Sequence, residues 1–302
     1  MSTHLAEPTV ADPPSTGTRP DIGRLLVHTT DRPGVVGAVG RFLAEAGANI
    51  VSLDQHSTAP QGGDFFQRTE FHLTDLAARR DQLERTFAAE VAGPLGLDFQ
   101  FTEAAQKKRV AIMVSKYDHC LLDLLWRWRR DELAMTVPMV ISNHEDLRES
   151  VEAFGVPFVH IPVTRDTKPE AEARLLEILA GRVDLVVLAR YMQIISDDFL
   201  DRVGVPLINI HHSFLPAFVG ANPYLRAEER GVKLIGATAH YVTADLDEGP
   251  IIEQDVVRVS HRDDVAELIR RGAEVERSVL ARAVRWHCED RIARHNNSTM
   301  VF

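Results

Sequence analysis

A stretch in the C-terminal half of the chain carries side chains that could move protons and stabilise negative charge. Asn209 and His211 alternate with apolar residues in Leu207–His211, and Asp247 lies in the polar loop that follows a second apolar run, Leu234–Tyr241. An amide N–H suits a developing oxyanion, an imidazole can transfer protons, and a carboxylate can orient the imidazole or a water molecule. The set has no nucleophile, so it predicts direct attack by water or an amine on an amide-like carbonyl.

The strand expected at Leu207–His211 determines where these side chains point. Side chains two residues apart in a strand lie on one face, so Asn209 and His211 share a face at the strand's carboxyl end. Open α/β sheets place their ligand crevice at this edge. By the same alternation, His212 is expected to point away from the crevice.

Two other interpretations of these residues remain open. A lone histidine at the end of a strand is more often a hydrogen-bonded structural residue than a catalytic one. His211, His240 and Asp247 could also be zinc ligands, since imidazole and carboxylate suit that ion. The chain has no HExxH-type spacing, which argues against a metal site.

The chain resembles the formyltransferases that use formyltetrahydrofolate at three places: the triplet Asn209-Ile210-His211, the turn Ser213-Phe214-Leu215-Pro216, and Asp247, thirty-six residues after His211. The resemblance implies that Asn209, His211 and Asp247 are a catalytic trio acting on the N10-formyl group of a folate, without metal or other cofactor. From about Arg24 onward the chain is more narrowly similar to the formyltetrahydrofolate deformylases. That similarity implies hydrolysis of 10-formyltetrahydrofolate to tetrahydrofolate and formate, which balances folate pools and supplies formate for purine synthesis.

The segment Ala189–Ser196 follows an expected strand, Leu185–Leu188, and therefore lies at the same edge of the sheet. By resemblance, part of this segment together with His240 would line the folate pocket: Met192, Gln193, Ile194 and Ile195. Its apolar side chains fit an aromatic bicycle, and its backbone groups could bind the edge of that ring. Ordinary packing of a loop is the alternative.

The identity of the acceptor depends on the turn Ser115–Cys120. A phosphate-bearing acceptor would need small residues there, so that backbone N–H groups can approach the anion. The turn has no glycine, bulky side chains and the carboxylate of Asp118, so we expect water as the acceptor. A transferase acting on an amine such as a glycinamide nucleotide stays open because Lys116 could hold an anion, and a non-catalytic sensor of folate and amino acids is a further alternative.

The N-terminal third has the pattern of a separate small domain. Strands and helices are expected in the order βαββαβ, which indicates a ferredoxin-like unit. Three glycines, at 34, 37 and 40, have the spacing GxxGxxG and not that of a dinucleotide fingerprint. With Asp31-Arg32-Pro33-Gly34 after the first strand, the unit resembles an ACT domain. The resemblance implies an amino-acid effector near Asp31 and Gly34 and a homo-oligomer, and a purely structural pairing module is the alternative.

Strands and helices alternate after this unit, which predicts a doubly wound, mostly parallel, Rossmann-like sheet of the α/β class. We expect a disordered tail over residues 1–22, the ACT domain over 23–103, a linker over 104–108 and the formyltransferase-fold catalytic domain over 109–302. The chain is expected to end in a long helix, Arg262–His287, and a polar tail.

Composition limits the partners of this 302-residue chain. It has 34 Lys and Arg against 44 Asp and Glu, a formal net charge of −10, and no basic face for nucleic acid. Only two cysteines are present, Cys120 and Cys288, without CxxC spacing, which indicates a reducing compartment. With no run of membrane-spanning length, the sequence predicts a cytoplasmic protein that binds no membrane.

Overall fold

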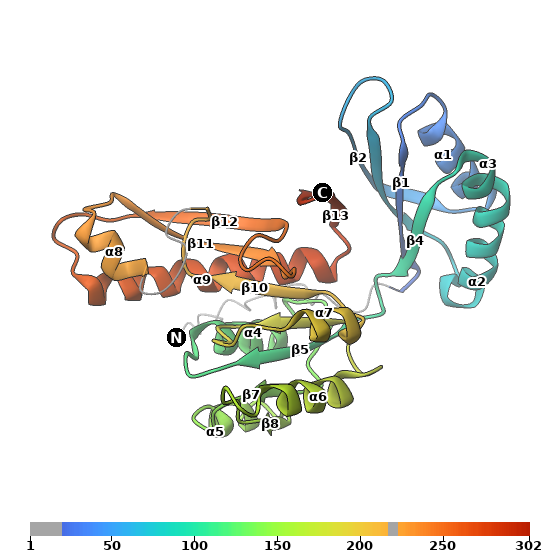
Figure 1. The fold of residues 1–302 in the computed structure, drawn as a ribbon. Helices are drawn as coiled ribbons and strands as arrows, with labels where there is room; N and C mark the ends of the chain where they lie inside the picture. The colour runs from blue at the N-terminus through green and yellow to red at the C-terminus, as the bar shows by residue number, and fades with distance from the viewer. Residues whose placement is uncertain (1–19, 217–222) are drawn as a thin grey trace, which may run out of the picture.

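A computed structural model describes residues 20–216 and 223–302 of the chain. The first domain is a four-stranded antiparallel sheet in the order β2-β3-β1-β4 (Figure 1). Its main elements are β1 (Ile22–Thr30), α1 (Val35–Glu45), β2 (Asn49–Ser57), β3 (Asp64–His72), α2 (Leu76–Phe87) and β4 (Asp98–Glu103). The expected βαββαβ order is confirmed. The expected tail over 1–22 lies outside the described residues except for its last three, and Ile22 already belongs to β1.

Helices α1 and α2 pack on one face of this sheet. Val39 and Leu43 recur at helical spacing in α1 and are fully buried, and Phe87 of α2 meets Phe42 and Phe101 edge to face. After α2 the chain continues through a π-helical turn over Ala88–Ala92 and a short helix α3 (Gly93–Leu95). Helix α3 ends where Gly96 adopts a left-handed φ of 56°.

The second domain contains the larger sheet, with strand order β12-β11-β10-β9-β5-β7-β8 and a short β6 beside β5. Pairing is parallel from β10 to β8 and antiparallel at β11 and β12. Its strands are β5 (Lys108–Val114), β6 (Met135–Thr136), β7 (Val140–Ser142), β8 (Phe158–His160), β9 (Leu185–Leu188), β10 (Leu207–His211), β11 (Leu234–Tyr241) and β12 (Ile251–Arg258). The predicted α/β class and mostly parallel sheet are confirmed.

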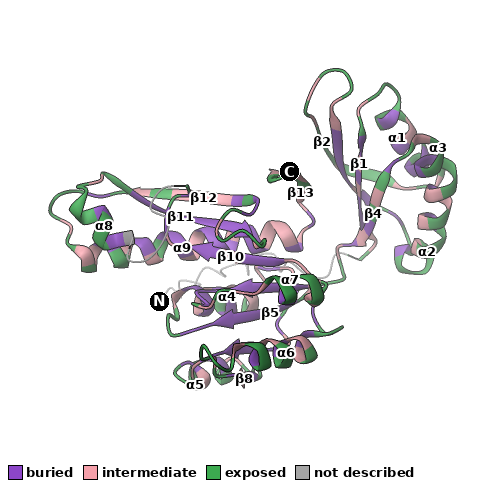
Figure 2. Cartoon of the chain, in the orientation of Figure 1, coloured by how far each residue is buried: buried purple, intermediate pink, exposed green. Residues whose placement is uncertain are grey.

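Helices cover both faces of this sheet. On one side are α4 (His119–Arg129) and α9 (Val265–Cys288), and on the other α6 (Lys168–Leu179) and α7 (Asp197–Val203). Side chains of β5 alternate between the two cores: Val110 and Ile112 pack with α4 and α9, whereas Ala111 and Met113 pack with α6 and α7. Figure 2 shows the central strands as buried and the outer helices as partly exposed. Two further helices, α5 (Arg148–Glu152) and α8 (Pro223–Glu229), are short.

The C-terminal residues differ from the expected polar tail. They form a hairpin of β13 (Ile292–His295) and β14 (Ser298–Val301), with Asn296 in the turn at a left-handed φ of 52°. The ring of His295 lies 5.6 Å from that of Phe66 in β3. The hairpin therefore packs against the first domain's sheet, which the sequence pattern did not indicate.

Asp290, just before this hairpin, connects the two domains. Its carboxylate lies 3.1 Å from Nη1 of Arg24 and 2.6 Å from Nζ of Lys108, and it accepts a hydrogen bond from the Thr102 hydroxyl at 2.8 Å. Nε of Arg68 donates to the Asp290 carbonyl at 3.0 Å. Burial acts to raise the pKa of Asp290, but Lys108, Thr102 and Arg24 hold it below its usual range. The carboxylate is thus a shared ionic centre between the sheets.

Between β4 and β5 the chain makes a short turn over residues 104–107, so Lys108 is the first residue of the second domain's sheet. Within the described part of the chain, no helix is both long enough and apolar enough to cross a membrane.

Candidate active site

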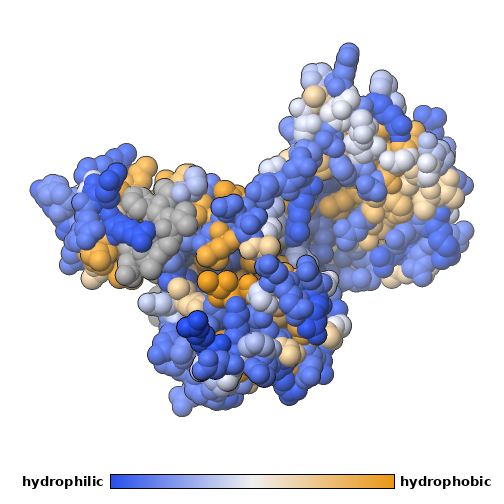
Figure 3. All heavy atoms as spheres, viewed as in Figure 1, coloured by the Kyte–Doolittle hydropathy of each residue, from blue (hydrophilic) through white to orange (hydrophobic). Residues whose placement is uncertain are grey.

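A cavity of about 850 Å³ opens at the carboxyl edge of the larger sheet. The ends of β9, β10 and β11 meet there because β9 and β10 are parallel neighbours and β11 pairs with β10. Every residue that the sequence singled out as catalytic or folate-binding lines it: Asn209, His211, Asp247, Met192, Gln193, Ile194, Ile195 and His240. Figure 3 shows hydrophobic surface gathered near the middle of the catalytic domain, in the region of β10.

His211 is held by Asp247 at one ring nitrogen and is free at the other. Nδ1 of His211 lies 3.1 Å from Oδ2 of Asp247. Nε2 of His211 is buried and has no hydrogen-bond partner among the described residues. A carboxylate only accepts, so it selects the form of the ring that carries a proton on Nδ1. The ring therefore presents Nε2 to the cavity for proton transfer.

Asn209 is positioned by His240 on the neighbouring strand. Asn209 and His240 are register partners between β10 and β11, and Nδ2 of Asn209 lies 3.3 Å from Nε2 of His240. The other ring nitrogen, Nδ1 of His240, lies 3.0 Å from the carbonyl oxygen of Tyr241, so it carries a proton. In the neutral ring Nε2 then accepts from the Asn209 amide, which leaves a second amide N–H of Asn209 for a ligand.

Asp247 stays ionised near neutral pH. Partial burial acts to raise its pKa, but the hydrogen bond from His211, with His240 close by, outweighs burial and holds the pKa of Asp247 well below its usual range. Its Oδ1 lies 3.6 Å from Nε2 of His240. Asp247 has a left-handed φ of 59°, a conformation that an aspartate tolerates better than most residues and that turns its carboxylate toward β10 and β11.

His212 lies at the same cavity, contrary to the expectation that it would point away. The strand ends at His211, and the chain turns there, so the alternation of side chains does not continue to the next residue. The His212 ring lies 5.3 Å from that of His211 and 6.0 Å from that of Tyr224. Burial, with Arg190 nearby, lowers the pKa of His212 to about 4, so this ring is neutral near neutral pH.

The loop expected to bind the folate ring presents apolar side chains. Met192 and Ile194 are 52% and 64% exposed and lie along the cavity. The loop is anchored just after the end of β5, because the backbone N–H of Met192 donates to the Ser115 hydroxyl at 2.9 Å. Exposed apolar side chains on an anchored loop suit contact with a flat ring better than packing within the protein.

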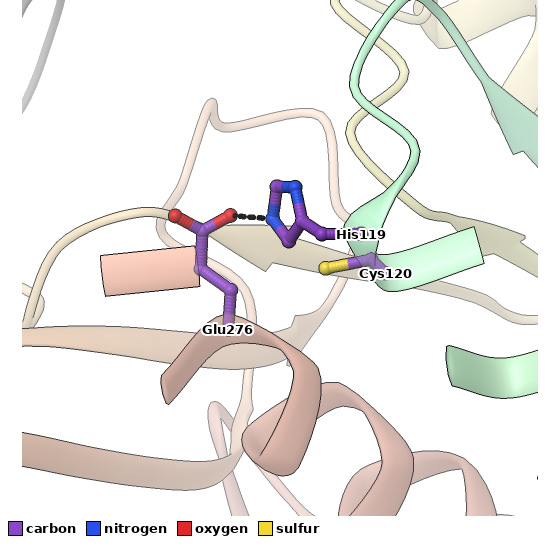
Figure 4. Close-up of side chains that lie close together, drawn as sticks. All are labelled: His119, Cys120 and Glu276. Atoms are coloured by element: carbon purple, nitrogen blue, oxygen red, sulfur yellow. Dashed lines mark hydrogen bonds and ion pairs between the residues drawn. The ribbon is translucent and has the colours of Figure 1, made fainter. Parts of the chain in front are cut away.

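A second polar cluster at this cavity was not identified from the sequence. Oε1 of Glu276 accepts from the Tyr224 hydroxyl at 2.7 Å, and Oε2 lies 2.8 Å from Nε2 of His119 and 3.5 Å from Nε of Arg190. Glu276 is buried on α9 among the apolar residues of that helix, and this position of a charged residue was the available sequence signal. Figure 4 shows His119, at the start of α4, pointing to Glu276 with the Cys120 sulfur beside them.

Among the described residues, His119, Cys120 and Glu276 are a group whose ligand atoms lie close enough to consider a metal ion, all within 4.8 Å. The surroundings favour hydrogen bonding. Both oxygens of Glu276 already have donors, and the Arg190 guanidinium is close to one of them. Burial and the charge of Glu276 raise the pKa of Cys120 well above its usual range, which disfavours the thiolate that a metal would need.

Comparisons with known proteins agree with this architecture. Residues 108–284 match the family model described as formyl transferase, and residues 23–88 match the ACT domain model. A protein of Mycobacterium tuberculosis named formyltetrahydrofolate deformylase is 67% identical, over 93% of this chain and 91% of that protein.

Two solved structures resemble the fold of this chain over different shares of its length. A crystal structure of a formyltetrahydrofolate deformylase from Pseudomonas syringae has a TM-score of 0.87 and 47% identity, covering 93% of this chain and 94% of that one. A glycinamide ribonucleotide transformylase from Symbiobacterium toebii has a TM-score of 0.60 and 32% identity, and covers 67% of this chain and 96% of its own.

Proposed function

The chain belongs to the formyltetrahydrofolate deformylase family, and we propose that it hydrolyses 10-formyltetrahydrofolate to tetrahydrofolate and formate. The observation that carries this proposal is the His211 ring, held at Nδ1 by Asp247 with a buried, unpartnered Nε2 at the cavity. A ring nitrogen in this state can take a proton from water and pass it to an amine leaving group.

In the proposed reaction a water oxygen attacks the formyl carbon, and the bond from that carbon to N10 breaks. Asp247 orients the water and the His211 ring, and the free amide N–H of Asn209 donates to the formyl oxygen as it gains negative charge. Nε2 of His211 takes a proton from the attacking water and delivers it to N10, because an unprotonated amine leaves a tetrahedral intermediate poorly. One water is consumed, and the products are the secondary amine of tetrahydrofolate, formate and a proton.

The folate ring would lie against Met192, Gln193, Ile194 and Ile195. Exposed apolar side chains on a loop fixed through Ser115 support this placement. His240 would act through Asn209, since its ring nitrogen accepts a hydrogen bond from the Asn209 amide. The His240 side chain is buried, with 2% of its surface exposed. We therefore assign His240 as a positioning residue.

Water is favoured as the acceptor by the turn between β5 and α4. Tyr117 and His119 line the cavity from this turn, and their bulk occupies space that an anionic acceptor would need beside backbone N–H groups. A transferase acting on a glycinamide nucleotide is the second candidate, supported by the structural likeness to a transformylase.

Purified protein incubated with 10-formyltetrahydrofolate tests the proposal, with formate and tetrahydrofolate both assayed. We expect formate at the same rate with and without a glycinamide nucleotide. Turnover only with the nucleotide would mean a transferase. No turnover under either condition would favour a non-catalytic sensor.

We propose that the reaction needs no metal or other cofactor. The hydrogen bonds that satisfy Glu276 and the protonated Cys120 thiol support this view. Dialysis against a chelator should leave the rate unchanged. Activity lost on dialysis and restored by zinc would assign a metal to the cluster of His119, Cys120 and Glu276.

The ACT domain is proposed to pair in a homo-oligomer and to bind an amino-acid effector near Asp31 and Gly34. All nine residues of β2 lie at a sheet edge without being buried, and Val51 is 55% exposed, which supports pairing there. Gly34 has a φ of 99° at the start of α1, and the Asp31 carboxylate accepts from the Ser57 hydroxyl at 2.6 Å. A thermal-shift screen of the twenty amino acids tests sensing, and no shift with any of them would leave pairing alone.

Cytoplasmic localisation, formate supply for purine synthesis and the absence of nucleic-acid or membrane partners also stay proposals. The net charge of −10 supports the absence of a nucleic-acid partner. Fractionation of cells, followed by detection of the protein in each fraction, tests the first of these proposals.

A further inference from the structure

Arg190 lies at the same edge of the sheet as His211. It follows the end of β9, whose Leu188 is the register partner of Asn209 in the parallel neighbour β10. The side chains of Arg190 and His211 both line the cavity.

The backbone of Arg190 is in an uncommon conformation. Its φ is 64°, in the left-handed region where glycine is the unstrained residue, so an arginine there strains the backbone. Its carbonyl accepts a hydrogen bond from the backbone N–H of Ser115 at 3.2 Å, which fixes this conformation. Backbone strain at a residue that lines a cavity points to a role for its side chain there.

The guanidinium is buried but incompletely paired. Arg190 is only 7% exposed, and its Nε and Nη1 have no hydrogen-bond partner within the described part of the chain. Nε lies 3.5 Å from Oε2 of Glu276, too far for a good hydrogen bond, and the group faces the Tyr117 ring at 5.0 Å. A buried charged donor without a hydrogen bond is costly, so these N–H groups are suited to a ligand.

Glu276 is held in place by other donors and leaves these N–H groups available. Its two oxygens accept from Tyr224 and pair with His119 at 2.7 and 2.8 Å, which are shorter contacts than the one to Arg190. Burial acts to raise the pKa of Glu276, but His119 and Arg190 keep it below its usual range, so Glu276 stays charged. The Glu276 carboxylate therefore balances the charge of Arg190 but leaves N–H groups of its guanidinium without a hydrogen bond.

We propose that Arg190 binds the carboxylate of the formate product, a role that rests on the proposed hydrolysis. A free guanidinium N–H donates a strong, charge-assisted hydrogen bond to a carboxylate oxygen, and formate is the carboxylate that this reaction would generate at the cavity. The buried position favours an anion of formate's size over a larger one. The terminal carboxylates of the folate share this chemistry, and the experiment separates the two sources.

The test compares Arg190→Met with Arg282→Met. Arg282 is on α9, contacts Glu253 and Asp255 of β12 and does not line the cavity, so it serves as the control. Formate inhibition of tetrahydrofolate production is measured for each, with substrate KM alongside. Since hydrogen bonds to a charged group are each worth a factor of ten or more, the inhibition constant for formate should rise about 10- to 100-fold in Arg190→Met. It should stay unchanged in Arg282→Met, with KM of Arg190→Met within about threefold of wild type.

An unchanged formate constant in Arg190→Met would overturn the inference, as would a higher KM alone, which would assign Arg190 to the folate's own carboxylates. If Arg190→Met does not fold, the wild-type protein is titrated calorimetrically with formate and then with acetate, in the presence of tetrahydrofolate. The two affinities then test the inference. Tighter binding of formate supports the inference, and no binding of either anion overturns it. Failure of the wild type to release formate from the substrate would instead refute the proposed hydrolysis, since these titrations need no turnover.

Discussion

His211 and Asp247 are separated by thirty-six residues in the chain, yet Nδ1 of the first lies 3.1 Å from Oδ2 of the second. The contact joins the end of β10 to the loop after β11, and antiparallel pairing of these strands brings both to one edge. Because Asp247 is ionised, it orients the His211 ring and stabilises its protonated form. The two residues should therefore act as one unit.

Replacing Asp247 by asparagine removes the charge and keeps the size of the side chain. We expect kcat to fall by about 10²- to 10⁴-fold, since proton transfer by His211 depends on that carboxylate. Adding His211→Gln to this variant should cause little further loss, because residues of one unit are not additive. Steady-state rates of the two single variants and the double variant measure this, and losses that multiply would separate the two roles.

Acid should destabilise the protein partly through His212 and His287. Burial lowers the pKa of each to about 4 from an ordinary 6.5, so the unfolded chain binds protons more readily than the folded one. Their stabilising effect is present above pH 6.5 and is lost as the pH falls through about 4. The melting temperature of His212→Gln should fall less than that of wild type across this range. A parallel decline in both proteins would contradict the assignment.

The junction between the domains should depend on Asp290. Asparagine at this position leaves Arg24 and Lys108 without their shared carboxylate, and breaking a buried ion pair costs about 3 kcal/mol or more in the free energy of unfolding. The exposed pair of Asp198 and Arg202 offers a matched control, and Asp198→Asn should cost no more than about 0.5 kcal/mol. Denaturant unfolding followed by tryptophan fluorescence compares them. Equal free energies of unfolding for the two variants would show that the ion pairs of Asp290 do not stabilise the junction.

Strand periodicity was sufficient to predict the elements that hold the catalytic trio. The bounds expected for β9, β10 and β11 agree with the structure, since each is a buried apolar run with clear ends. The edge strand β12 was not predicted because its middle is polar. Glu253 and Asp255 there pair with Arg282 of α9, so the polarity reflects a tertiary contact that local patterns do not report.

The parts of the site that could not be predicted depend on distant residues meeting. His212 lies at the cavity because the strand ends one residue earlier, and period-two alternation contains no information on that end. Glu276 comes from α9, His119 from the start of α4 and Arg190 from the segment after β9, and only packing of α9 on the sheet brings them together. Single buried charges in apolar segments were the one available signal.

The rate of formate release by His211→Gln tests the central claim most directly. Glutamine retains hydrogen bonding toward Asp247 but cannot deliver a proton, and the exposed His261→Gln serves as the control. We expect normal folding and folate binding in both variants, with hydrolysis at least about 100-fold slower in His211→Gln and unchanged in His261→Gln. Hydrolysis at the wild-type rate in a folded His211→Gln protein would contradict the account and remove this histidine from the mechanism.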